Sequence, residues 1–188
     1  MLTDEQILQD LEKLKTIAAD HKAVGSEYET ETATIAGLEL DVFKNIPENL
    51  GELYRKGLVA GDKDFLVYQN ERFSFEEAFD LARRMARVLL EQFQVKPGDS
   101  VAVCARNSPE WCISYMAISL MGAIVVPMNS WWKGPELKYG LNDSGSKLIF
   151  IDPARLSLLE PFLGELNVEI VQIKPELETV FPEFYELA

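Results

Sequence analysis

Few side chains of this sequence combine reactivity with a spacing that catalysis requires. His21 is the only histidine of the 188 residues, and it follows a helical pattern in a stretch without an apolar period. A Ser/His/Asp triad or a histidine-rich metal site needs an imidazole that a rigid element holds in place. We therefore interpret His21 as a solvated surface residue.

Other residues of reactive type have simpler explanations. Ser144 and Gly145 lack the GxSxG frame of a nucleophile turn, and a helix end at Gly145 explains the pair. Glu76 and Glu77 begin a helical pattern, where carboxylates cap the helix and stabilise its positive end. Neither a GxGxxG turn nor a Walker-type loop occurs in the sequence. The sequence therefore assigns no catalytic, cofactor-binding or metal-binding residue.

Arg83, Arg84 and Arg87 form the notable basic cluster of the chain. Such a cluster can hold a phosphate, but Asp80 and Glu91 lie at helical spacing from it and favour a solvated, charge-balanced helix face. We take the solvated face as the main interpretation and phosphate binding as the alternative.

Trp131 and Trp132 follow a strand pattern at residues 123–128. Parallel sheets bind ligands at the carboxyl ends of their strands, which is where this pair is expected. Tryptophan rings also suit a partly buried loop, because one end of the ring is apolar and the other is polar. Packing is the main interpretation, and ligand binding stays open.

Composition narrows the class of protein. The net charge of -13 opposes binding to a nucleic-acid backbone. Cys104 and Cys112 lie in apolar patterns that predict buried free thiols, which indicates a reducing compartment. Met1 is followed by Asp4 and by further acidic residues, so neither a secretory signal nor a transit peptide is readable. We expect a cytoplasmic location.

The segments that contain these residues alternate between helix and strand patterns. Residues 3–20 predict a helix with a capping box at Thr3 and Gln6, followed by a flexible connection and a strand at 34–43. Residues 65–75 predict a hairpin with Asn70 in its turn, and Ser74 begins a long helix. Strands at 100–105, 123–128, 147–151 and 168–173 then alternate with helices. The pattern predicts an α/β fold, a parallel sheet with helices on both faces after an N-terminal helix and an antiparallel hairpin.

The run from Trp111 to Trp132 carries no charged residue. A membrane span needs about 20 apolar residues, whereas serines dilute this run and Gly122 and Pro127 divide it. We expect two buried elements, a helix and a strand, rather than a membrane span.

Several turns resemble one family, the adenylate-forming (AMP-binding) enzymes, in which the bacterial long-chain fatty acyl-CoA synthetases are the most similar group. The likeness covers roughly residues 35 to 155, including a lead-in at residues 37–50. The runs that carry it, in the family's order and spacing, are residues 73–78 (FSFEEA), 95–102 (VKPGDSVA), 106–111 (RNSPEW), 122–129 (GAIVVPMN), 131–137 (WWKGPEL) and 143–147 (DSGSK).

The resemblance implies a Rossmann-like subdomain of the acyl-CoA synthetase fold and a ligase that activates a carboxylic acid, by preference a fatty acid, with Mg-ATP. The acyl-adenylate would then pass its acyl group to CoA. The family's Ser/Thr/Gly-rich phosphate loop, its ribose-binding Asp and its late catalytic Lys have no counterpart in this sequence. We therefore expect an N-terminal fragment that binds no ATP, Mg or CoA by itself and is catalytically inactive.

The expected organisation is an N-terminal helix with a flexible connection at 1-33, an α/β subdomain at 34-174 and a truncated tail at 175-188. A subdomain severed from its ligase exposes apolar surface, through which the rest of the ligase or a second copy of the chain can bind. The alternative function is a freestanding, non-catalytic binding or regulatory module that associates with a ligase. An independent Rossmann-like nucleotide binder is disfavoured because the Gly-rich turn is missing.

Overall fold

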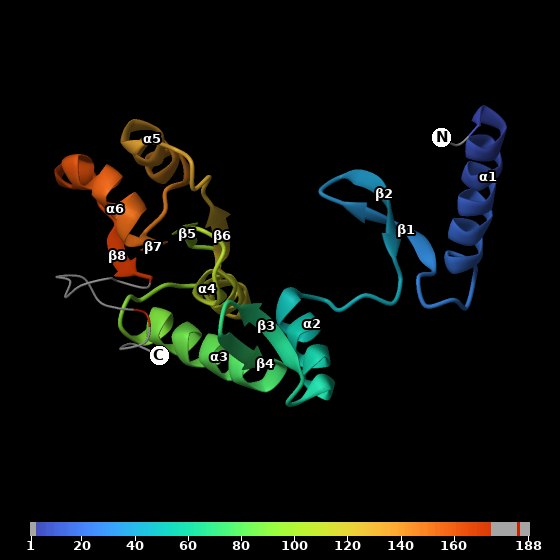
Figure 1. The fold of residues 1–188 in the computed structure, drawn as a ribbon, viewed down its shortest axis with the longest axis horizontal. Coiled ribbons are helices and arrows are strands. Elements are labelled where there is room, and N and C mark those ends of the chain that lie inside the picture. Colours follow the sequence, from blue (N-terminus) through green and yellow to red (C-terminus); the bar gives the residue numbers. More distant parts are fainter. Residues whose placement is uncertain (1–2, 174–183, 185–188) are drawn as a thin grey trace. The chain divides into compact units, whose positions relative to one another are not determined.

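The computed structural model of the chain describes residues 3–173 and residue 184 (Figure 1). Its contacts divide the chain into two compact units, Met1–Glu48 and Asn49–Ala188. This division falls 15 residues beyond the first boundary expected from the sequence, because a hairpin of residues 30–43 spans that boundary. The division into 1-33, 34-174 and 175-188 stays a prediction, and its tail, apart from Phe184, lies outside the described residues.

The first unit holds one helix and one hairpin. Its elements are α1 (Asp4–His21), β1 (Thr30–Ile35) and β2 (Leu38–Phe43). The predicted capping box is confirmed: the Gln6 backbone N–H donates to Thr3 Oγ1 at 3.2 Å, and the Thr3 N–H donates to Gln6 Oε1 at 2.9 Å. Local chemistry thus fixes where α1 begins.

The prediction of a flexible connection up to residue 33 was wrong at its end. β1 begins at Thr30 and pairs antiparallel with β2, and the loop between them is Ala36 and Gly37, both with positive φ. That geometry suits a two-residue hairpin loop. The strand was missed because most of its residues are exposed, so the sequence shows no alternation between apolar and polar positions.

The second unit begins with short elements that lead into a long helix. They are α2 (Leu50–Gly57), the 3-10 helix η1 (Leu58–Ala60), β3 (Asp64–Tyr68), β4 (Glu71–Ser74) and α3 (Phe75–Glu91). The predicted hairpin is confirmed by β3 and β4, although the turn residue with positive φ is Gln69 and not Asn70. The capping box of Ser74 and Glu77 is confirmed, with the Ser74 N–H 2.8 Å from Glu77 Oε2.

Four parallel strands form the sheet of the second unit, in the order β6-β5-β7-β8. They are β5 (Ser100–Cys104), β6 (Ile124–Pro127), β7 (Leu148–Ile151) and β8 (Glu169–Gln172). Each agrees with a predicted strand to within two residues, and the predicted α/β fold class is confirmed. β5, the first of the four in the chain, lies inside the sheet between β6 and β7.

Helices cover both faces of this sheet. They are α4 (Pro109–Leu120), α5 (Gly134–Ser144), α6 (Pro153–Leu159) and the 3-10 helix η2 (Glu160–Glu165). Val101, Phe150 and Val171 pack in one apolar cluster with α3 and α4, and Phe184 lies against the ring of Phe150. On the opposite face, Cys104 and other strand residues pack with α5 and α6 (Figure 1). The uncharged run from Trp111 to Trp132 thus supplies α4 and β6, as expected.

β6 forms one edge of the sheet and ends in a proline. The N–H groups of Ile124 and Met128 donate toward β5, to Asp99 O at 2.8 Å and Val103 O at 2.9 Å. Because successive residues of a strand point their N–H groups to opposite sides, the nitrogen of Pro127 faces the open edge. A proline carries no N–H, so within β6 only Val125 offers a donor on that side.

Candidate functional site

The strongest candidate site lies where the strand order reverses. The chain leaves β5 toward α4 on one face of the sheet and leaves β7 toward α6 on the other, so the loops after these neighbouring strands diverge. In parallel α/β sheets, ligands bind in the crevice outside the carboxyl ends of the strands at such a reversal. A cavity of about 210 Å³ lies there, between the loop at residues 105–108 and the start of α6.

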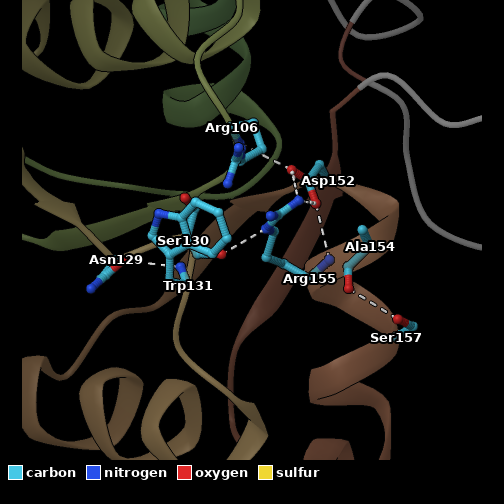
Figure 2. A network of polar contacts seen from close by, with 8 residues as sticks. All are labelled: Arg106, Asn129, Ser130, Trp131, Asp152, Ala154, Arg155 and Ser157. Atoms are coloured by element: carbon cyan, nitrogen blue, oxygen red, sulfur yellow. Dashed lines mark hydrogen bonds and ion pairs between the residues drawn. The ribbon is translucent and has the colours of Figure 1, made fainter.

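Asp152 and Arg155 tie three loops together at this edge (Figure 2). Asp152 Oδ2 accepts a hydrogen bond from the Arg106 backbone N–H at 3.0 Å, and its Oδ1 accepts one from the Arg155 N–H at 2.9 Å. The Arg155 guanidinium pairs with Asp152 at 3.1 Å and donates to Ser130 O at 2.9 Å. Both side chains are about 85% buried, with 16% of Arg155 and 15% of Asp152 exposed. The loops after β5, β6 and β7 are thereby held in one arrangement.

Arg106 and Trp131 form the exposed part of the site. The Arg106 guanidinium carbon lies 4.2 Å from the centre of the Trp131 ring, within the range of a cation–π contact (Figure 2). The Trp131 N–H donates to Asn129 Oδ1 at 2.9 Å, which fixes the loop that carries the ring. Trp131 is 74% exposed. The pair therefore offers a cation and an aromatic face to solvent.

Cys104 ends β5 directly beside this network and is fully buried. Burial, with a smaller contribution from the Asp152 charge and an opposing one from Arg155, raises the pKa of its thiol to about 12. A thiol with that pKa stays protonated at neutral pH and is a poor nucleophile. Cys112 is a half-buried free thiol whose pKa is also raised by burial.

A larger surface cavity, of about 690 Å³, lies beside the start of α3. Its lining includes Glu76, Glu77 and Arg83. Glu77 accepts the hydrogen bond that caps α3, as the sequence predicts. We give more weight to the smaller cavity, because it lies at the reversal of the sheet and is bordered by groups that the fold holds in place.

The predicted basic cluster is engaged on the helix surface. Asp80 pairs with Arg84 at 3.1 Å and with Arg83 at 3.8 Å, and Arg87 pairs with Glu91 at 2.8 Å. This arrangement agrees with the main interpretation from the sequence, a charge-balanced helix face. Phosphate binding by the cluster stays untested.

The other candidates from the sequence do not meet. His21 ends α1 in the first unit, where its ring contacts Tyr28 with centroids 5.9 Å apart. Ser144 donates to Gly140 O at 2.7 Å and lies 2.7 Å from Ser146 Oγ. Gly145, with φ of 61°, ends α5 as expected. Trp132, unlike Trp131, is partly buried and packs against the core, so the tryptophan pair divides between packing and exposure.

The arrangement at the carboxyl edge can bind and orient, but it offers no reactive group. Its carboxylate, Asp152, is engaged by Arg155 and two backbone N–H groups, and Cys104 is held protonated. Among the described residues, no three His, Cys, Asp or Glu side chains cluster as metal ligands would. These residues do not fit a Mg-ATP site. The pairing of Asp152 with Arg155, three residues apart at the start of α6, was not predicted. The contact of Arg106 with Trp131 was not predicted because it joins loops that are far apart in the sequence.

Comparison with known proteins identifies the family. The AMP-binding enzyme family matches residues 54–183. The chain belongs to the AMP-binding enzyme family. The matched segment includes the whole parallel sheet and the carboxyl edge just described. The resemblance that the sequence motifs carry is therefore confirmed.

Individual members of the AMP-binding family resemble this chain over part of their length. The 4-hydroxybutyrate–CoA ligase 2 of Metallosphaera sedula is 29% identical over 125 residues, covering 66% of this chain and 21% of the relative. The long-chain-fatty-acid–CoA ligase FadD13 of Mycobacterium tuberculosis is 36% identical over 78 residues, covering 42% of this chain and 15% of the relative. The chain thus spans about a fifth of the length of the curated relatives that it matches.

Solved structures of the same family share the fold. The anthranilate CoA ligase AuaEII, in complex with anthranoyl-AMP, superposes with a TM-score of 0.71 and 25% identity over 76% of this chain and 28% of that one. The N-terminal domain of FACL13 from Mycobacterium tuberculosis gives a TM-score of 0.61 and 26% identity over 66% of this chain and 33% of that one. None of the helices in the described part of the chain is long and apolar enough to cross a membrane.

Proposed function

We propose that this chain supplies the N-terminal α/β subdomain, residues 34-174, of an ATP-dependent acid–CoA ligase. The complete enzyme activates a carboxylic acid as an acyl-adenylate, with ATP and Mg, and transfers the acyl group to CoA. The observation that carries the proposal is the family match over residues 54–183, in a fold that superposes on adenylate-forming CoA ligases.

A fatty acid is the proposed substrate of the complete enzyme. Support comes from the FadD13 ligase, which is 36% identical over 78 residues. The relatives also include ligases named for 4-hydroxybutyrate and 2-succinylbenzoate, so members of the family are named for different acids. The proposed location is the cytoplasm, where the partner is the remainder of the ligase.

The chain alone is proposed to be catalytically inactive. Phosphoryl and adenylyl transfer depend on cations and hydrogen-bond donors that stabilise the charge of the transferring group. At the carboxyl edge, Arg155 is neutralised by Asp152, which leaves Arg106 as the exposed cation of the cavity lining. One exposed arginine is too little to hold a triphosphate and its metal.

Pyrophosphate release by the purified chain tests the inactivity. The assay contains ATP, Mg and CoA with palmitate, 4-hydroxybutyrate or anthranilate as the acid, and no release above background is expected. Specific turnover with any of these acids would refute the proposal that the chain is inactive.

A segment exchange tests the contribution to a ligase. Residues 54–173 replace the matching segment of the Metallosphaera sedula relative, and the chimaera is expected to retain acid-dependent ATP–pyrophosphate exchange. An Arg155→Ala chimaera is the matched variant, expected to melt at a lower temperature because the loops at the carboxyl edge are released. A chimaera that folds, as shown by its circular dichroism, but has no exchange activity would contradict the proposed role.

A further inference from the structure

The N-terminal helix α1 carries an apolar face that no described residue of the first unit covers. None of its residues is buried, and the exposed fractions of its large apolar side chains run from 44% for Ile7 to 63% for Leu8. Soluble proteins rarely leave such a continuous apolar stripe uncovered, and stripes of this kind mark association sites.

The stripe has the spacing of a coiled-coil seam. Ile7, Leu11, Leu14 and Ala18 are separated by four, three and four residues, which is the alternation that two paired helices need. The 18-residue helix holds about two and a half seven-residue repeats. A seam this short is suited to a partner helix of equal length.

The charges of α1 are divided between its two ends. Residues 4–12 carry four carboxylates and no lysine, whereas residues 13–22 carry three lysines and one carboxylate. Asp10 and Glu12 pair within the helix with Lys13 and Lys15, at 3.7 Å and 2.8 Å. The first half, with four carboxylates, thus has a net charge of -4, and the second, with three lysines and one carboxylate, has one of +2, so opposite halves of two copies attract. The helix dipole has the opposite sense, with its positive end at the amino terminus, and offsets part of these side-chain charges.

We propose that α1 pairs antiparallel with α1 of a second copy of this chain. In one register, Leu11 lies opposite Leu14 of the other copy, Ile7 lies opposite Ala18, and Asp4 lies opposite His21. Every apolar seam position then meets an apolar position. Asp10 lies opposite Lys15 and Glu12 opposite Lys13 of the other copy, while Glu5 lies opposite Asp20. Such an interface is isologous and closes as a dimer, because the same surface is used twice.

A membrane surface is a poorer occupant of this face. Interfacial helices that bind anionic lipids carry lysine and arginine on their polar face, whereas the amino-terminal half of α1 carries only acidic charges. A parallel pairing is also disfavoured, since it places like charges side by side. The antiparallel pair alone satisfies both the seam and the charges.

Sedimentation of the full chain over a range of concentrations tests the proposal. The unchanged chain is expected to shift from monomer to dimer as its concentration rises. Leu11→Asp is expected to weaken the dimer by roughly tenfold or more, because a charge replaces a central apolar contact. Gln9→Asp is the matched control: it makes the same change in charge on the outer face and should dimerise like the unchanged chain. A chain that stays monomeric at every concentration, or a Gln9→Asp variant as weak as Leu11→Asp, overturns the proposal.

Disulfide trapping tests the orientation without relying on a disruptive variant. In a Cys112→Ser background, a mixture of Ile7→Cys and Ala18→Cys chains is expected to cross-link, because these positions face each other. Ile7→Cys alone is expected to remain uncross-linked. Cross-linking of Ile7→Cys with itself would show a parallel pair and overturn the antiparallel arrangement. If the chain does not dimerise but co-sediments with anionic vesicles, the apolar face of α1 binds membranes, and the proposal is overturned.

Discussion

Helices α1 and α3 begin with the same chemistry and end in different environments. Each starts at a capping box, and they have 18 and 17 residues. Yet α3 buries five residues, among them Ala82 and Leu89, whereas α1 buries none. The comparison shows that capping determines where a helix begins, while burial depends on whether the surrounding sequence provides a sheet to pack against. The second unit has such a sheet and the first has a two-stranded hairpin.

The largest difference in stability between variants of the two units is expected when an aromatic ring is removed from the core. Phe150 is fully buried in β7, and Phe150→Ala should lower the free energy of unfolding of the second unit by about 3–5 kcal/mol. Leu14, in α1, is 61% exposed, so Leu14→Ala should leave the urea midpoint of the second unit unchanged. Urea denaturation monitored by tryptophan fluorescence compares the two variants. Equal effects would show that the units do not differ in packing.

Gly134 tests how tightly α5 packs within the second unit. A Cβ atom at this position would lie 2.2 Å from Leu158 O and 2.5 Å from a ring carbon of Phe162. Gly134→Ala should therefore cost about 3 kcal/mol, since backbone must move to relieve the overlap. Gly164→Ala is the control, because its Cβ atom meets nothing within 4 Å. Thermal unfolding of both variants measures the difference. Similar melting temperatures would contradict the close packing of α5 at Gly134.

Ion pairs of the two units should also differ in how much they contribute to the stability of the second unit. Asp152→Ala leaves Arg155 without its partner and removes the cap of α6, at an expected cost of about 2–3 kcal/mol. Asp152→Asn should cost less, because the amide oxygen can still cap the helix. In the first unit, Lys44 and Glu29 pair at 2.8 Å, and Lys44→Ala is expected to leave the melting of the second unit unchanged. Differential scanning calorimetry measures all three.

Because the Cys104 thiol is buried, we expect the second unit to lose stability at alkaline pH. The pKa of Cys104 is raised from 9.0 to about 12, so the unfolded chain releases its thiol proton first. The stability that the protonated Cys104 thiol gives the folded chain is fully present below pH 9. The free energy of unfolding then declines by about 1 kcal/mol per pH unit as the pH rises toward 12. Cys104→Ala should remove this part of the slope. Urea unfolding at several pH values checks it, and identical slopes for both chains would contradict the assignment.

The smallest effects should come from the caps themselves. Ser74→Ala is expected to lower the free energy of unfolding of the second unit by about 1 kcal/mol, because α3 is part of its core. Thr3→Ala should lower the helical circular dichroism of α1 without moving that unfolding transition. A shift of the transition by Thr3→Ala would show that α1 is coupled to the core.

Most of the elements could be predicted because their signals are local. Thr3 and Ser74 cap helices at the positions that the sequence indicates, and Gly145 ends α5. The strand expected at residues 34–43 is confirmed in part by β2, whereas β1 could not be predicted from alternation because it has no buried face.

The candidate site was far less accessible from sequence. The carboxyl end of β6 was expected to bring Trp131 and Trp132 to the ligand side, but the sequence does not say which ring packs. The contact of Trp131 with Arg106 requires the order β6-β5-β7, which places the two loops side by side. Strand order depends on how helices pack on the two faces, and no local pattern reports it.

The proline at the end of β6 has a consequence for growth of the sheet into a filament. A strand from another molecule that approached this side would find a single outward amide donor, at Val125, and could not form a continuous ladder. The β6 margin therefore resists the addition of strands from other molecules. Any strand added to this sheet is steered to the opposite margin, beside β8.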